Sequence, residues 1–375
     1  MSTPNAHTPA KATSYWDYIR VEQLLALQGG LESDDASLAN EEVLFITVHQ
    51  LFELSFKLVL RELRTARELF FLPHVAEQQL SGGVRSLKRA MTILRNTGPN
   101  WEVMETLTTR EFLAFRDKLI PASGFQSAQL RQIEILLGLE EPERIALGVE
   151  GGYLEALRSH DGTPSPAYKR VEAQLAERRS VRDAVHAWLW RTPIDGCGPN
   201  EKDAEARLTR FLERFLAAHA LEVDSTAKRA ASIARTSDDA DMIHKRYEGE
   251  KSSVRAFFTP SEADGGSRRR RIRAAMLFIE TYRELPLLAW PREVLDALVE
   301  LEQQFVIFRQ RHARMVERVI GRRVGTGGSA GVDYLDKTAL SYRVFRDLWA
   351  IRTLQVRRDA APALEHPDFY GFRNE

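Results

Sequence analysis

The histidine at position 312 lies in the middle of an apolar stripe and is the first candidate for metal chemistry. In FVIFRQRHARMVERVIG, the residues Phe308, His312 and Met315 follow one another at helical spacing, with charged residues on either side. A buried imidazole must satisfy both ring nitrogens, and a metal on one with a hydrogen-bond acceptor on the other does so. From the pattern alone, a hydrogen-bonded core histidine is the commoner outcome.

A second histidine, His49, has the same kind of surroundings. In EEVLFITVHQLFELSF, the residues Phe45, His49 and Phe52 share one helical face. Glu53 follows one turn later, where it could orient the imidazole ring or form an ordinary polar pair on the helix surface. A core histidine again fits this pattern without any function.

The sequence lacks several motifs, which narrows the chemistry of these histidines. Cys197 is the only cysteine, and HxxxH, HExxH and CxxC spacings are missing, which argues against a structural zinc site. Haem remains compatible, because one axial histidine on a helix is enough to hold its iron. A serine hydrolase is poorly supported, since no GxSxG motif is present.

Arg116 is a candidate for binding a carboxylate. Thr108 or Thr109 can cap a helix that carries Phe112 on its apolar side, with Arg116 beside it. An arginine next to an aromatic face suits a bidentate grip on a carboxylate. An arginine that only covers apolar surface fits the same pattern.

A glycine-rich segment, GRRVGTGGSAGVDYL, follows the helix of His312. Its glycines permit backbone conformations that are closed to other residues, so it can fold over a ligand or simply link two helices. It lacks the GK[ST] ending of a nucleotide-binding loop and does not join a strand to a helix. The glycines are Gly325, Gly327, Gly328 and Gly331.

Helices must position these residues, because apolar side chains recur at three and four positions almost everywhere and alternating strand patterns are nearly absent. The sequence therefore predicts an all-α fold. The expected helices are 16–28, 40–71, 84–96, 109–119, 125–138, 180–191, 204–220, 268–284, 291–320 and 337–355.

The chain between 141 and 270 differs from the rest, because turn-rich breaks such as HDGTPSPAY and RTPIDGCGPN surround shorter, more polar helical stretches. We expect a helical insertion at 141–270 within a catalytic core formed by 1–140 and 271–375. The run from Arg268 to Arg271 predicts a charged helix start that faces solvent, with a phosphate-binding patch as the alternative.

Composition excludes some classes of partner. The chain has 53 basic and 53 acidic residues, so no overall field attracts nucleic acid or an anionic membrane, and we expect neither as a partner. A small uncharged or zwitterionic ligand fits better. No apolar run resembles a membrane span or a signal peptide, and one cysteine cannot form an internal disulfide. We therefore expect a cytoplasmic protein.

Four ordered blocks closely resemble the tryptophan 2,3-dioxygenase family. They are YWDYIRVEQLLALQ, FITVHQ, FLAFRDKLIPASGFQSAQLRQIEILLG and HARMVERVIGRRVGTGGSAGVDYL, and RDKLIPASGFQS and GTGGSAG are the specific parts. The resemblance implies an all-helical enzyme with haem b that converts L-tryptophan and O2 to N-formylkynurenine, the first step of the kynurenine pathway. It also implies a homo-oligomer, usually a tetramer, with a dimer as the alternative.

The same resemblance implies roles for individual residues. His312 matches the axial ligand of the haem iron, and His49 matches the distal catalytic histidine that faces the indole N–H. Arg116 matches the residue that pairs with the substrate carboxylate, and Thr326 matches a loop residue at the amino-acid end of the substrate. Phe45 and Phe112 match aromatic pocket positions, and Tyr15, Tyr18 and Ile19 match a segment that reaches a neighbouring subunit's site.

The chain departs from the family pattern beside His49, where HQLFELSFK places Leu51, Phe52 and Ser55 at positions that usually hold other residues. A related haem enzyme that hydroxylates or epoxidises a modified indole or another aromatic amino acid is therefore an alternative. HARM contains no cysteine, so covalent haem attachment is not expected. Outside the enzymes, the alternative is a haem-binding sensor or scaffold.

Overall fold

The structure is a computed structural model that describes residues 13–119, 126–145, 152–159, 161–323 and 331–371, with only the backbone at position 77. Every regular element in these ranges is a helix. The one β-type contact there is an isolated bridge between Ile194 and Cys197. The prediction of an all-α fold is confirmed.

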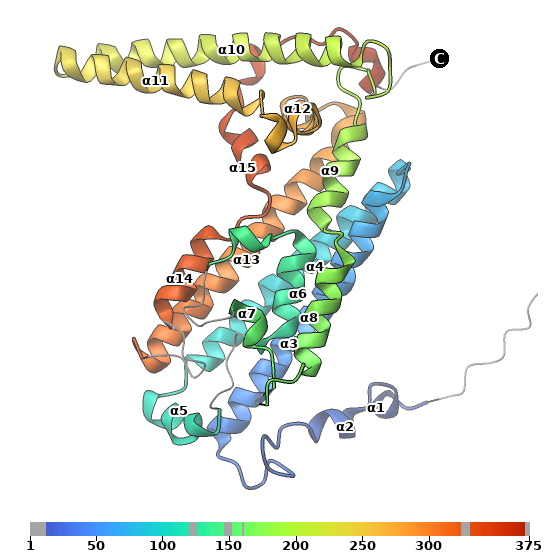
Figure 1. Ribbon diagram of the computed structural model, residues 1–375, viewed down its shortest axis with the longest axis vertical. Coiled ribbons are helices and arrows are strands. Elements are labelled where there is room, and N and C mark those ends of the chain that lie inside the picture. Colours follow the sequence, from blue (N-terminus) through green and yellow to red (C-terminus); the bar gives the residue numbers. More distant parts are fainter. Residues whose placement is uncertain (1–12, 120–125, 146–151, 160, 324–330, 372–375) are drawn as a thin grey trace, which may run out of the picture.

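Three long helices form the centre of the molecule (Figure 1). They are α3 (Asn40–Phe71), α4 (Glu77–Met104) and α13 (Ala289–Ile320). Helix α4 packs against both α3 and α13. Apolar side chains at three- and four-residue spacing bury one face of each helix, and Leu63 and Leu298 are completely buried.

Shorter helices surround this centre and supply the remaining walls of the site. Helix α6 packs on α3, α8 packs on α6, α9 packs on α3, and α14 packs on α13. Their bounds are α5 (Thr109–Phe115), α6 (Ala128–Leu137), α7 (Gly152–Glu155), α8 (Pro166–Glu177), α9 (Val181–Arg191) and α14 (Val332–Ser341).

Two antiparallel helices, α10 (Ala204–Ser232) and α11 (Ser237–Phe257), form an arm that projects from one end of the bundle (Figure 1). The arm joins the bundle near α12 (Gly266–Thr281) and α15 (Arg346–Thr353). At the other end, α1 (Tyr15–Tyr18) and α2 (Val21–Leu25) lie away from the bundle. Short 3-10 turns are η1 (Arg116–Leu119), η3 (Glu141–Glu143), η4 (Glu262–Asp264), η5 (Pro286–Leu288), η6 (Arg358–Ala360) and η7 (Pro367–Tyr370).

Several expected helices have different lengths or breaks in the structure. The helix expected at 16–28 is two short pieces, because Arg20 between them has a left-handed backbone with φ of 56°. The helix expected at 84–96 begins at 77 and continues through Pro99 to 104. Burial against two long neighbours outweighs the hydrogen bond that a proline inside a helix removes.

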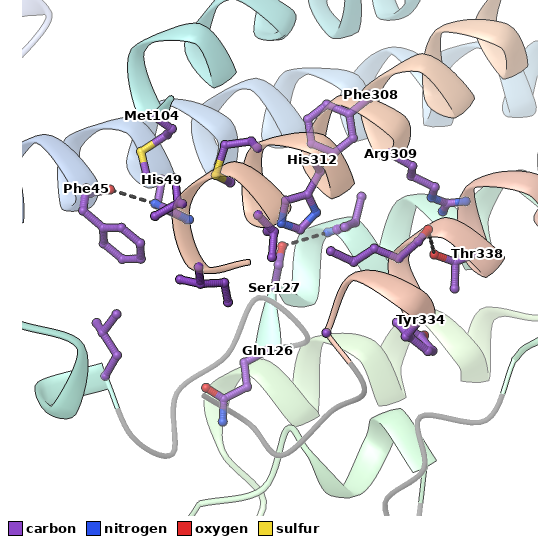
Figure 2. A pocket seen from close by; sticks show the side chains of 18 of the residues that line it. Phe45, His49, Met104, Gln126, Ser127, Phe308, Arg309, His312, Tyr334 and Thr338 are labelled. Atoms are coloured by element: carbon purple, nitrogen blue, oxygen red, sulfur yellow. Dashed lines mark hydrogen bonds between the residues drawn. The ribbon is translucent and has the colours of Figure 1, made fainter. Parts of the chain in front are cut away.

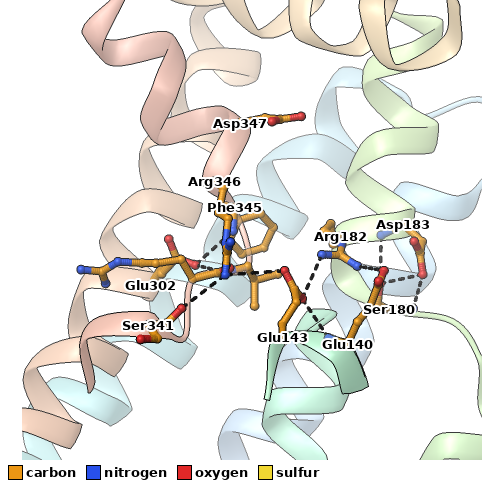
Figure 3. Close-up of polar contacts among 12 residues, drawn as sticks. Glu140, Glu143, Ser180, Arg182, Asp183, Glu302, Ser341, Phe345, Arg346 and Asp347 are labelled. Atoms are coloured by element: carbon orange, nitrogen blue, oxygen red, sulfur yellow. Dashed lines mark hydrogen bonds and ion pairs between the residues drawn. The ribbon is translucent and has the colours of Figure 1, made fainter. Parts of the chain in front are cut away.

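The helix expected at 337–355 is divided between α14 and α15 by a buried carboxylate. Glu302 of α13 accepts hydrogen bonds from the backbone N–H groups of Val344 and Phe345 and from the indole N–H of Trp349. Figure 3 shows Glu302 beside Phe345 at this break. These bonds replace helical ones at the break. Glu302 thereby fixes the joint between α14 and α15 to α13.

The segment from 141 to 270 contains two kinds of structure. Helices α8 and α9 pack on the central helices, whereas α10 and α11 project as the arm. The helices at 166–177 and 237–257 were not expected, and α10 continues twelve residues beyond the expected end at 220. The division into a core and an insertion at 141–270 remains a prediction.

The arginine run at the start of α12 is more buried than expected. Arg271 is only 3% exposed and donates hydrogen bonds to the carbonyl groups of Trp190, Thr192 and Cys197. Arg269 pairs with Asp347 of α15 at 3.1 Å. The expectation that the whole run faces solvent is therefore wrong, because its side chains tie α12 to its neighbours.

Among the described helices, α3 alone is long and apolar enough, by length and composition, to cross a membrane. Long core helices pass the same test. In this fold α3 packs against α4, α6 and α9, and its buried face includes Val59 and Leu63. Its apolar character is accounted for in part by this packing.

Candidate active site

A cavity of about 420 Å³ lies between α3, α5, α6, α13 and α14. Its volume is within the range of small-molecule and cofactor sites. Most of its wall is apolar, with Leu130 from α6 and Met315, Val316 and Val319 from α13. The candidate residues that line it are Phe45, His49, Phe112, Arg116 and His312. Figure 2 shows three of them, Phe45, His49 and His312, from close by.

His312 has an imidazole ring that the protein holds by stacking rather than by hydrogen bonds. The ring lies parallel to the indole of Trp101, with centroids 4.7 Å apart and an interplanar angle of 10°. Within the described part of the chain, no group hydrogen-bonds either ring nitrogen. Burial, and then the nearby His49, lower the pKa of His312 to about 4. The imidazole is therefore neutral at pH 7 and has a lone pair available.

His49 is hydrogen-bonded on only one side of its ring. Its Nδ1 lies 2.7 Å from the carbonyl oxygen of Phe45, one turn earlier in α3. A carbonyl oxygen only accepts, so Nδ1 carries the proton and Nε2 keeps its lone pair in the neutral ring. Burial lowers the pKa of His49, although the Phe45 carbonyl and the charge of Glu53 act in the opposite direction. Nε2 of the neutral His49 ring can thus accept a hydrogen bond.

Glu53 does not orient the His49 ring by a hydrogen bond, which was one of the two interpretations of its position. Its carboxylate instead accepts from the hydroxyl of Ser127 at 2.5 Å and from the side-chain amide of Gln129 at 2.8 Å. Ser127 is also the N-cap of α6, where it accepts from the N–H of Leu130. These bonds fix the start of α6 against α3 at the edge of the cavity.

Aromatic rings form the wall next to His49. Phe45, Phe112 and Phe115 lie with their ring centroids between 5.3 and 5.9 Å apart. Thr108 caps α5 and, with Glu111, forms a capping box, so the expected cap is confirmed at Thr108. The capped helix presents Phe112 to the cavity and brings Arg116 to its rim.

A buried carboxylate, Glu134 of α6, holds three guanidinium groups on the opposite wall. It pairs with Arg131 at 2.9 Å, with Arg144 at 2.7 Å and with Arg309 at 2.6 Å. Burial opposes ionisation of Glu134, but the three guanidinium groups outweigh it and lower the pKa of its carboxyl to about 2. We call these four residues the Glu134 cluster. Because Arg309 lies one turn before His312, the cluster fixes the His312 helix to α6.

Helix α14 closes the cavity with Tyr334 and Thr338. It begins after Gly331, which has a φ of +57°. A Cβ atom at Gly331 would lie only 2.9 Å from the carbonyl oxygen of Arg323, so the close approach of these two backbone segments requires glycine.

Three candidate residues lie outside this cavity, and a fourth is not placed by the structure. Thr326 lies outside the described residues, so its place is untested. Tyr15 and Tyr18 are 76% and 77% exposed on α1, and Ile19 is 43% exposed at its end. None of these three lines the cavity of its own chain.

Sequence reasoning missed Trp101, the Glu134 cluster and the Ser127–Glu53 contact. Trp101 follows Pro99, and its expected helix ended before it. Arg309 is one of the charged residues beside His312, and nothing in its own stretch of sequence indicated that its side chain is only 11% exposed and pairs with Glu134. One feature of the sequence could have indicated the Glu134 cluster. In QLRQIEILLG a glutamate lies within an apolar run, and a carboxylate buried in such a run needs cationic partners.

Comparison with known proteins decides what kind of site this is. A family model described as tryptophan 2,3-dioxygenase matches residues 1–355. The chain belongs to the tryptophan 2,3-dioxygenase family. A tryptophan 2,3-dioxygenase from Sorangium cellulosum is 54% identical over 97% of this chain and 89% of its own. Tryptophan 2,3-dioxygenase 2 from Ralstonia nicotianae is 49% identical over 97% of this chain and 99% of its own.

A shorter relative, a tryptophan 2,3-dioxygenase-like protein from Xanthomonas campestris, is 49% identical over 71% of this chain and 98% of its own length. Membership of the tryptophan 2,3-dioxygenase family makes this chain an oxidoreductase, with tryptophan and O2 as the substrates that the family implies. The resemblance of the four sequence blocks is thereby confirmed.

The haem group of tryptophan 2,3-dioxygenases can be tested against the residues of this cavity. In the described ranges, no three His, Cys, Asp or Glu side chains come together to hold a bare metal ion. A macrocycle brings four nitrogen ligands of its own and needs one axial ligand from the protein. The neutral His312 has apolar neighbours and forms no hydrogen bond through its ring nitrogens with the described residues, so it fits that requirement.

Proposed function

We propose that this chain is a haem b-dependent dioxygenase that inserts both atoms of O2 across the indole C2–C3 bond of L-tryptophan to give N-formylkynurenine. One observation carries the proposal. One apolar cavity contains both His312, whose ring nitrogens accept or donate no hydrogen bond among the described residues, and His49, whose Nδ1 donates to the Phe45 carbonyl. The pair would supply an iron ligand and a hydrogen-bond acceptor to the same space.

Haem, when bound, supplies the redox chemistry that activates O2, which amino-acid side chains cannot provide. His312 would hold its iron from α13. Stacking on Trp101 keeps the imidazole plane fixed, and the Glu134 cluster fixes α13 through Arg309. The protein thus positions the ligand with contacts from two other helices, α4 and α6.

The remaining residues bind and orient the amino acid. Arg116 at the rim would pair with the substrate carboxylate, because a guanidinium binds a carboxylate with two parallel hydrogen bonds. The flat indole would lie against Phe45 and Phe112. His49 would accept a hydrogen bond from the indole N–H through Nε2 and would thereby hold the indole in one orientation.

We assign the other expected roles as parts of the same proposal. Thr326 would contact the ammonium and carboxylate end of the substrate. Tyr15, Tyr18 and Ile19 would complete the site of a neighbouring subunit, and their exposure on α1 leaves them available for that role. The assembly would be a homotetramer. We also propose a cytoplasmic enzyme of the kynurenine pathway, in keeping with a single, reduced and buried Cys197.

The test is a single-turnover reaction with isotopically labelled oxygen. The haem-loaded, reduced protein is mixed anaerobically with L-tryptophan, exposed to 18O2, and the product is identified by mass and fragmentation. N-formylkynurenine with two 18O atoms is expected. A product with one 18O atom would instead assign the chain to the haem monooxygenases that act on aromatic amino acids. Unchanged tryptophan with bound haem would leave a haem enzyme that acts on a modified indole or another aromatic amino acid, or a sensor or scaffold without turnover.

A further inference from the structure

A second hollow lies behind the wall of the active-site cavity and has very different chemistry. It has a volume of about 620 Å³ and lies between α3, α6 and α8. Lys57, Arg61 and Arg64 line it from one face of α3, and Arg170 lines it from α8. The chain as a whole has no net charge, so four cations in one hollow are a local concentration of charge.

The four cations are not held in close ion pairs, although Arg64 lies near enough to Glu177 to lower the pKa of that carboxyl. None of them forms an ion pair with a carboxylate in the described part of the chain, and Arg64 donates only to the neutral side chain of Gln174. Lys57 and Arg61 lie four residues apart on a helix, a spacing at which like charges repel. An anion in the hollow would remove that repulsion.

Glu53 is the one carboxylate that lines the hollow in the described part of the chain, so four positive charges face one negative charge. Both oxygens of Glu53 accept hydrogen bonds, one from Ser127 and one from Gln129, which hold the carboxylate at the edge of the hollow. Leu60 and Ala128, which are almost completely buried, form its apolar floor. The site is therefore a cationic rim over an apolar floor, lined by α3, α6 and α8.

We propose that this hollow binds a small soluble anion that carries two or more phosphate or carboxylate groups. Three of the four cations are arginines, whose planar guanidinium groups bind such oxyanions with paired hydrogen bonds. The cations face each other from α3 and α8 across a concave space, which suits a compact polyanion better than a long nucleic-acid backbone. The ligand would be distinct from tryptophan and haem, which belong to the other cavity.

Calorimetric titration of the full-length protein with pyrophosphate and with citrate tests this proposal at constant ionic strength. The test variant is R61Q/R170Q, which removes one cation from each side of the hollow. The control is K245Q/R246Q, which removes the same charge from exposed positions on α11. Circular dichroism verifies that both variants are folded.

The expected result is binding of at least one anion by the wild type and by the control, with affinity at least about tenfold weaker in R61Q/R170Q. Tighter binding of pyrophosphate would identify phosphate groups, and tighter binding of citrate would identify carboxylates. The proposal is overturned if neither anion binds the wild type, or if R61Q/R170Q binds as tightly as the control. If neither anion binds, and R61Q/R170Q changes the mass of the assembly while K245Q/R246Q does not, the four cations contact another copy of the chain and the proposal is likewise overturned.

Discussion

Replacing Glu134 with glutamine removes one charge and takes from three buried guanidinium groups the carboxylate that they share. The side chains of Glu134, Arg131, Arg144 and Arg309 are all less than 12% exposed, and the three ion pairs are 2.6 to 2.9 Å long. Breaking a buried pair by removing one partner costs about 3–5 kcal/mol. The free energy of unfolding of E134Q should therefore fall by at least about 3 kcal/mol, out of a total of about 5–15 kcal/mol.

The measurement is urea-induced unfolding followed by circular dichroism, with the free energy taken from the midpoint and slope. The matched control is E317Q on α13. Glu317 pairs with Arg314 at 2.6 Å, but the two side chains are 36% and 52% exposed. Such a pair contributes at most about 1 kcal/mol. If E134Q and E317Q unfold within about 1 kcal/mol of each other, the Glu134 cluster does not hold α13 to α6 as we infer.

Three further predictions concern the haem ligand, the substrate carboxylate and acid stability. H312A should lose stoichiometric haem, measured by the Soret absorbance after gel filtration, and full haem retention would reassign the axial ligand. R116A should weaken tryptophan binding by at least about tenfold, because the substrate carboxylate is left unpaired in a partly buried pocket. R116K should recover only part of this loss. Unchanged affinity in R116A would show that the carboxylate binds elsewhere. Burial, and then Arg182, lower the pKa of His186 to about 4, below its ordinary 6.5. As the pH falls, the unfolded chain therefore binds a proton at His186 before the folded chain does. The contribution of neutral His186 to the free energy of unfolding is complete above pH 6.5 and is lost as the pH falls to 4. The urea midpoint of H186Q should depend less on pH between 6.5 and 4 than that of the wild type, and an equal pH dependence would contradict this.

Continuous apolar periodicity allowed the long helices to be predicted from sequence. The helix expected at 40–71 has these bounds in the structure, and that expected at 291–320 begins two residues earlier. Helix α11 was missed because it has almost no apolar stripe, and only Val254 is buried in it. Its packing partner α10 stabilises it, which a pattern within its own sequence cannot reveal.

A residue of the cavity could be predicted from sequence only where its neighbours along the chain form an apolar helical face. His49 and His312 lie in apolar stripes, so both were found, and both line the cavity. Arg309 and Glu134 are 175 positions apart, and each looks like an isolated charge until the fold brings them within 2.6 Å. Local spacing describes one helix face, whereas a buried ion pair depends on how two helices pack.

The close contact between Gly331 and the Arg323 carbonyl brings together two positions that are eight residues apart in the sequence. The entropy of bringing these two positions together is lost when α13 and α14 pack, so ligand binding does not have to provide it. Doubling the length of a closed loop costs only about 0.6 kcal/mol. Lengthening the chain between positions 323 and 331 should thus be tolerated, whereas a side chain at position 331 would separate the two backbone segments.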